Sequence, residues 1–197
     1  MGLEYERYLN RLDQLIYQEV VPKTAIFDYF TRHLYRLDDK PYEKEPLVWF
    51  IQTALYSDIT FSIFRLFDRN SDRNIFHFLD YTEKHLSSIQ WITPLNRTKI
   101  NEQRAELAAV STQIELLRKR RNKFFGHYNK KFFYEPDKVN DDFPFSNEDA
   151  ITLVRVLQRV ISAHMHAFHG HASISIEGFL YVAAEKLYEA IRRSHIT

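Results

Sequence analysis

Apolar residues recur every three or four positions along most of this chain, which is the spacing of amphipathic α-helices. The segment after Pro22, for example, carries Ile26, Phe27, Phe30 and Leu34 at helical spacing. The pattern predicts helices over about 4–20, 23–37, 46–67, 74–89, 98–133, 147–170 and 178–194.

Local signals mark several helix boundaries. Pro22 is expected to break or kink the first helical stretch, whereas Pro46 suits the first turn of a helix. Ser146 and Asp149 have the spacing of a capping box. The polar, acidic stretch 137–145 is predicted to be a loop, and no linker or internal repeat divides the chain.

The composition agrees with an all-helical fold. The 197 residues include only 4 glycines and 6 prolines, fewer than a sheet-rich fold with many tight turns would need. With 45% apolar residues, the chain is long enough to build one core and short for two. We therefore predict an all-α, single-domain helical bundle of about five to seven helices over residues 1–197.

Charge and cysteine content exclude several classes of protein. The 27 lysines and arginines balance 26 aspartates and glutamates, so the chain as a whole is neither a basic nucleic-acid coat nor an acidic tail. Cysteine is absent, which excludes disulfides, thiolate metal sites and a cysteine nucleophile. No secretory leader follows Met1, and we expect a cytoplasmic protein.

The longest apolar run, 47–64, is about long enough to span a membrane. Asp58 stands in its middle, and a central carboxylate costs roughly 2.5–3.5 kcal/mol on insertion scales. We therefore interpret the run as a core helix of a soluble protein and expect no membrane partner.

The helix predicted over 98–133 places an arginine where its apolar stripe calls for a buried side chain. The stripe consists of Ile100, Leu107, Val110, Ile114, Leu117, Phe124 and Tyr128. Arg121 occupies the stripe position between Leu117 and Phe124. Because burying an unpaired guanidinium is unfavourable, Arg121 needs a carboxylate, a bound phosphate or a wet cavity beside it. Asp58, on one helix face with Ser62 and Arg65, is the candidate carboxylate.

The surroundings of Arg121 are strongly basic, with no acidic residue between Glu115 and Glu135. The cations of this stretch are Arg118, Lys119, Arg120, Arg121, Lys123, Lys130 and Lys131. In a neutral chain such a concentration favours phosphate binding, and interleaved aromatic residues such as Tyr128 offer surfaces for stacking bases. The alternative is a solvated helix end with aromatic residues that pack in the core.

His127 is the histidine best placed for proton transfer, because an imidazole titrates near neutral pH. Arg121 and His127 are six positions apart, which is about 120° around an ideal helix. A two-fold dimer would bring the arginine of one chain toward the histidine of the other, and we expect a homodimer. The alternative is that His127 is an ordinary structural histidine.

Four further histidines lie near a predicted helix end, namely His164, His166, His169 and His171. Histidines suit a helix C-terminus, and no carboxylate lies between Gln158 and Glu177, so we expect no metal site there. The chain contains no glycine-rich phosphate loop, GxSxG or HExxH motif, and we expect no cofactor.

The spacing Arg121-Asn122-x4-His127, on a basic late helix of a small helical protein, resembles the signature of the HEPN superfamily. That signature has an arginine, usually a polar second residue, and a histidine after four to six intervening residues; here five intervene. A long helix from Pro46 that ends in Arg65-Leu-Phe-Asp68 resembles the AbiU-type abortive-infection branch. The resemblance covers roughly residues 45–130.

This resemblance implies a dimeric, metal-independent endoribonuclease that acts as a toxin or phage-defence effector. Arg121, Asn122 and His127 would form the catalytic site, and Asp58, Arg65 and Asp68 would have structural roles. The residues expected to contact RNA are Arg118, Arg120, Lys123, Tyr128, Lys130 and Lys131. The alternative is a non-catalytic helical module that binds a nucleotide, RNA or an antitoxin protein through the same basic surface.

Overall fold

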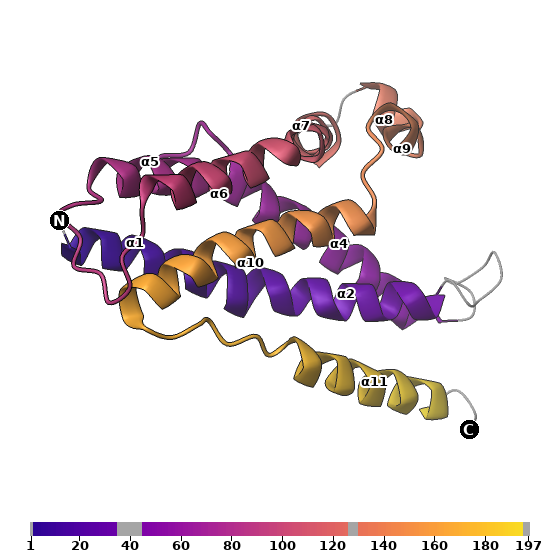
Figure 1. Cartoon of the computed structure of the whole chain (residues 1–197). Coiled ribbons are helices and arrows are strands. Elements are labelled where there is room, and N and C mark those ends of the chain that lie inside the picture. Colours follow the sequence, from indigo (N-terminus) through magenta and orange to yellow (C-terminus); the bar gives the residue numbers. More distant parts are fainter. Residues whose placement is uncertain (1, 35–44, 126–129, 195–197) are drawn as a thin grey trace.

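The computed structural model describes residues 2–34, 45–125 and 130–194, and these residues form α-helices, two π-helical segments and connections without a strand. The predicted all-α class is therefore confirmed. The first rod of the bundle consists of α1 (Gly2–Gln14), the π-helical segment η1 (Leu15–Val20) and α2 (Val21–Leu34), which follow one another without a break (Figure 1).

The break expected at Pro22 is absent, and η1 provides the reason. A proline in a helix lacks an N–H and its ring clashes with the carbonyl oxygen four residues earlier. In the turn before Pro22, the N–H of Val21 bonds instead to the carbonyl oxygen of Ile16, five residues earlier. This wider π-helical turn lets the chain continue as a helix through the proline.

Helices α4 (Pro46–Phe67), α5 (Ile75–Lys84) and α10 (Asn147–His169) also contribute to the main core. Pro46 occupies the first turn of α4, and the side chains of Ser146 and Asp149 form the predicted capping box of α10. Helix α10 packs against α1, α2 and α4, and also against α6 (Arg97–Ala109) and α7 (Ser111–Arg120). The residues sealed in this core include Tyr5, Leu9, Ile16, Ile63, Phe78, Leu117, Leu157 and Ile161.

The single helix predicted over 98–133 is divided. It consists of α6 (Arg97–Ala109), α7 (Ser111–Arg120), the π-helical η2 (Arg121–Phe125) and α8 (Lys130–Tyr134). The backbone departs from helical geometry at Val110 (φ −103°, ψ 17°), where a buried β-branched residue precedes Ser111 and Thr112. Figure 1 shows α7 almost end-on while α6 lies lengthwise, so the chain changes direction at this point.

The structure therefore contains more helical segments than about five to seven, because long stretches are subdivided. The region 137–145, predicted to be a loop, contains the short helix α9 (Lys138–Asp142). The last helix, α11 (Glu177–Ser194), packs on α2 through a second apolar cluster and lies along one edge of the bundle (Figure 1). That cluster includes Tyr29, Phe30, Val48, Ala184, Tyr188 and Ile191.

Helix α4 is long and apolar enough to cross a membrane by length and composition alone. Only 33% of its most apolar window is buried, and Leu47, Trp49 and Phe50 are exposed near its start. A helix that packs in the core of a soluble protein passes the same test, so this criterion does not by itself separate the two environments.

A neutral histidine lies at the centre of the bundle. His164 is fully buried on α10, where its Nδ1 accepts a hydrogen bond from the Tyr5 hydroxyl (2.8 Å) and its Nε2 donates to the Gln103 side-chain oxygen (3.0 Å). Burial lowers the pKa of His164 from 6.5 to about 3. The imidazole therefore joins α1, α6 and α10 as an uncharged link.

This burial predicts a loss of stability in acid. Below pH 6.5 the unfolded chain binds a proton at His164, whereas the folded protein does not until about pH 3. The free energy of unfolding should therefore fall by about 1.4 kcal/mol per pH unit across this window on account of His164 alone. Urea unfolding between pH 3.5 and 7 (about one point per half unit) measures the slope.

The variant His164→Gln should lose this one-proton contribution, and the change should appear as a shallower pH slope. His166→Gln is the matched control, because His166 is exposed on the same helix. Equal pH slopes in wild type and His164→Gln would contradict the assignment of a neutral buried imidazole.

Candidate functional site

The arginine that α7 buries is Arg120. The predicted stripe continues from Leu117 to Arg121, four residues onward, but a helical face also recurs three residues onward. In α7, which is regular up to Arg120, the position three residues after the fully buried Leu117 faces the interior. Arg120 is only 4% exposed, while Arg121 is half-buried.

The guanidinium of Arg120 is held by neutral groups. It donates to the Phe143 carbonyl oxygen (3.0 Å) and to the Asn140 side-chain oxygen (2.8 Å), and it stacks over the Tyr56 ring at 5.6 Å. Its Nε has no hydrogen-bond partner within the described part of the chain, and burial lowers the pKa of the guanidinium. Arg120, which the sequence analysis expected to contact RNA, is therefore a buried side chain that links α7 to α9 and to α4.

Arg121 has a different environment, between the protein surface and the core. One terminal nitrogen donates to the Asn122 side-chain oxygen (2.9 Å), and the guanidinium lies over the Phe64 ring at 5.0 Å. Its Nε has no partner among the described residues. Asn122 thus orients the neighbouring guanidinium, a role that the spacing of the motif does not reveal.

The ion pair considered between Arg121 and Asp58 does not form. Asp58 is exposed on α4 and pairs with Lys23 of α2, with 2.5 Å between the two charged atoms. Arg65 is exposed on the same helix, and Asp68 ends α4, where its carboxylate accepts the Asn70 backbone N–H (3.1 Å). No carboxylate in the described ranges pairs with Arg121.

Several cations of the basic stretch are already neutralised. Arg118 forms two 2.8 Å hydrogen bonds with Glu115, which raise the pKa of Arg118 and lower that of Glu115. Lys119 lies 3.8 Å from the same carboxylate, and Lys131 pairs with Asp142 of α9. Within the described ranges, Lys123 and Lys130 are exposed and form no ion pair.

The other two predicted residues of this region, His127 and Tyr128, lie outside the described residues. The structure thus provides the environment of Arg121 and Asn122 but not the relation of either residue to the histidine. In the part of the chain that the structure describes, no group of three or more His, Asp or Glu is arranged to hold a metal ion.

A cavity of about 620 Å³ lies beside α7, and the sequence analysis did not anticipate it. Its lining comes from the end of α4, the turn that follows, α5, α6 and α7. Phe64, whose ring lies under Arg121, is one of the lining residues. The only sequence signal was the polar turn 68–72 between two aromatic-rich helices.

An all-α bundle with an Arg-Asn pair at the end of a basic helix is the arrangement that the resemblance to the HEPN superfamily led us to expect. The family model HEPN_AbiU2, described as AbiU2, matches residues 24–186, and the chain belongs to this family. The match extends from α2 into α11, beyond the region 45–130 in which the sequence motifs lie. No curated protein and no solved structure matches the chain.

The burial of Arg120 predicts an unusual order of stability among its variants. Arg120→Lys keeps a buried charge but loses the two hydrogen bonds that the planar guanidinium donates to Phe143 and Asn140. It should therefore lower the free energy of unfolding by about 1–3 kcal/mol. Arg120→Met removes the charge together with its desolvation penalty and should be more stable than Arg120→Lys. Urea unfolding of the variants measures both values.

The matched control is Arg118→Lys, two residues earlier on the exposed side of α7, where an exposed ion pair should change stability by no more than about 0.5 kcal/mol. Amide exchange should also rise at residues 138–143 in Arg120→Met, since α9 loses its anchor. An Arg120→Lys variant as stable as wild type would refute the assignment of Arg120 as a buried anchor.

Proposed function

We propose that this AbiU2-family protein is a metal-independent endoribonuclease that acts as a toxin or phage-defence effector. The observation that carries the proposal is the environment of the Arg121 guanidinium. Its guanidinium is half-buried, oriented by Asn122 and Phe64, and without a carboxylate partner in the described ranges. An oriented, unpaired guanidinium with a partnerless Nε is suited to a phosphate diester.

The proposed reaction is transfer of the scissile phosphate to the neighbouring ribose. The 2′-oxygen attacks phosphorus and gives up its proton, while the bond from phosphorus to the 5′-oxygen breaks and that oxygen gains a proton. The products are a 2′,3′-cyclic phosphate and a 5′-hydroxyl. Arg121 offsets the negative charge that develops on the phosphate oxygens, and Asn122 keeps the guanidinium in position.

His127 acts in this proposal as the general base or acid, because its imidazole exchanges protons near neutral pH. Lys123 and Lys130, which are exposed and unpaired within the described ranges, attract the RNA backbone. The active form is a cytoplasmic homodimer in which Arg121 of one chain and His127 of the other complete each site. An antitoxin protein would restrain the enzyme by covering the same basic surface.

The first test is RNA cleavage by the purified chain in the presence of a chelator. We expect cleavage to persist in EDTA and to yield 2′,3′-cyclic phosphate ends. His127→Ala should reduce the cleavage rate by about 10²–10⁴, the usual effect of removing a proton-transfer group. His166→Ala, on the exposed side of α10, is the control and should leave the rate unchanged.

Salt-sensitive RNA binding without any cleavage, unaffected by His127→Ala, would favour the non-catalytic binding module instead. Cleavage that EDTA abolishes would contradict the proposed chemistry, since Arg121 and His127 require no metal.

The shared site predicts complementation between two inactive variants. When Arg121→Ala and His127→Ala chains are mixed and allowed to exchange subunits, each mixed dimer contains one site with both residues intact. Cleavage should then recover to about one quarter of the wild-type rate, because half of the dimers are mixed and each has one intact site of two. Mixtures that stay inactive although subunits exchange would exclude a site composed of both chains.

A further inference from the structure

The cavity beside α7 owes its shape to the break at Val110. Helix α6 packs along α5, whereas α7 turns away after Val110, so a space opens between α5 and α7 above the end of α4. Its volume of about 620 Å³ is within the range of small-molecule sites. The turn that follows α4 contributes Asp68, Arg69 and Asn70 to its lining.

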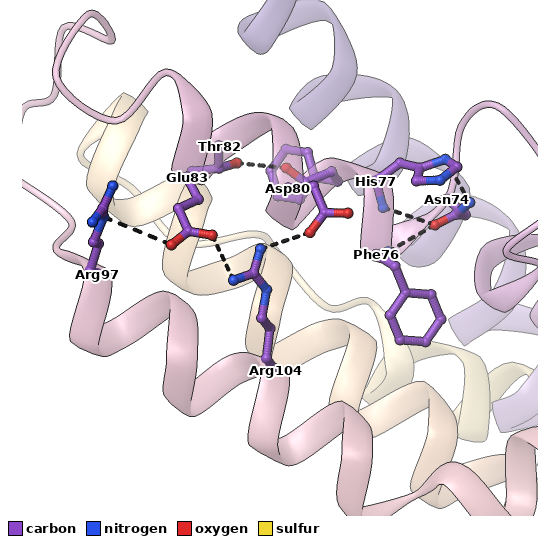
Figure 2. A network of polar contacts seen from close by, with 9 residues as sticks. Asn74, Phe76, His77, Asp80, Thr82, Glu83, Arg97 and Arg104 are labelled. Atoms are coloured by element: carbon purple, nitrogen blue, oxygen red, sulfur yellow. Dashed lines mark hydrogen bonds and ion pairs between the residues drawn. The ribbon is translucent and has the colours of Figure 1, made fainter.

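One wall of the cavity is fixed by the polar network in Figure 2. Arg104 of α6 bridges two carboxylates of α5, at 2.7 Å from Asp80 and 2.6 Å from Glu83. At the start of α5, the Asn74 side-chain oxygen accepts the backbone N–H groups of Phe76 and His77 (Figure 2). Helix α5 is therefore held in place, and the cavity exists before any ligand arrives.

The interior of the cavity is aromatic and apolar. Phe64 and Phe67 of α4 and Phe76 of α5 line it, together with buried leucines of α6 and α7. At the mouth, the guanidinium of Arg69 lies 3.8 Å from the centre of the Phe76 ring. The guanidinium covers one face of the ring, so a flat ligand can stack on the outer face of this planar cation, a surface on which nucleobases stack.

The charges that line the cavity favour a neutral ligand with polar edges over a bare phosphate. Three carboxylates, of Asp68, Asp80 and Glu115, face the guanidiniums of Arg69, Arg104 and Arg118, so the formal charges cancel. Arg104 and Arg118 are already engaged by carboxylates of the chain. Asp68 and Arg69 form no ion pair within the described ranges, and they remain available for a ligand.

The cavity is connected to the proposed catalytic arginine through a single ring. Phe64 lines the cavity and also lies under the guanidinium of Arg121, at 5.0 Å. Arg118 of α7, three residues before Arg121, lines the cavity as well. An RNA strand whose phosphate contacts Arg121 therefore has a neighbouring base within reach of this space.

We propose that the cavity binds one unpaired guanine base of the RNA, next to the phosphate held by Arg121. The base stacks on the Arg69 guanidinium, which is supported from behind by the Phe76 ring, and its adjacent N1–H and N2–H groups donate to the two oxygens of Asp68. Guanine is the base that offers two neighbouring donors to one carboxylate. This inference rests on the proposed function for the placing of the phosphate, but the base-binding site itself is testable without cleavage.

The test measures binding of GMP and AMP to the full-length His127→Ala chain by titration calorimetry, which separates binding from turnover. GMP should bind at least tenfold more tightly than AMP. Asp68→Asn keeps one oxygen for the Asn70 N–H but replaces the other by a donor, so it should remove the preference for GMP. Phe76→Leu should weaken both nucleotides by about tenfold, through loss of stacking.

The control variant is Lys99→Ala, whose side chain pairs with Glu102 on α6 and does not line the cavity. It should bind both nucleotides as the parent chain does. A short single-stranded RNA with one guanine should displace GMP, whereas a guanine-free RNA of equal length should not. Displacement by both RNAs alike, or GMP binding unchanged by both Asp68→Asn and Phe76→Leu, would overturn the proposal.

Failure of this inference is distinguishable from failure of the proposed function. If the wild-type chain cleaves RNA at sites unrelated to guanine and binds GMP no better than AMP, the guanine site is refuted while the nuclease remains. If GMP binds with the expected dependence on Asp68 but no RNA is cleaved, the base site remains and the nuclease is refuted.

Discussion

The burial of one guanidinium among neutral acceptors is the constraint on which the candidate site depends. Arg120 pairs with no carboxylate among the residues that the structure describes, and its terminal nitrogens donate to the Phe143 carbonyl and the Asn140 side chain. These contacts fasten α9 and the connection to α10 against α7 and α4. Because the next residue along the chain is Arg121, the same anchor determines where that side chain leaves the core.

Two irregular turns serve the site in different ways. The π-helical segment η1 allows the first rod to pass through Pro22, so that α1 and α2 both contribute to one core. The break at Val110 turns α7 away from α6 and opens the cavity next to Phe64. Departures from ideal helix geometry are common where a protein positions functional groups, and both of these are explained by identifiable residues.

Membership of the AbiU2 family and the environment of Arg121 are the two observations on which the proposed RNA chemistry rests. The net positive charge around Arg121 is lower in the folded protein than a count of the basic residues from 118 to 131 suggests. Glu115 pairs with Arg118, and Asp142 pairs with Lys131. The positive field is therefore concentrated on Arg121, Lys123 and Lys130. The field is thus local rather than spread along the whole helix.

The sequence by itself determined the all-α class, the bounds of α4, the capping box of α10 and the family, because periodicity, caps and a short motif are local properties. Only the tertiary structure decided which arginine is buried. Helical spacing allowed either Arg120 or Arg121 to follow Leu117 into the interior, and the packing of α7 against α9 and α4 selected Arg120. The cavity likewise required the packing of α4, α5, α6 and α7, since residues distant in the chain meet there only after folding.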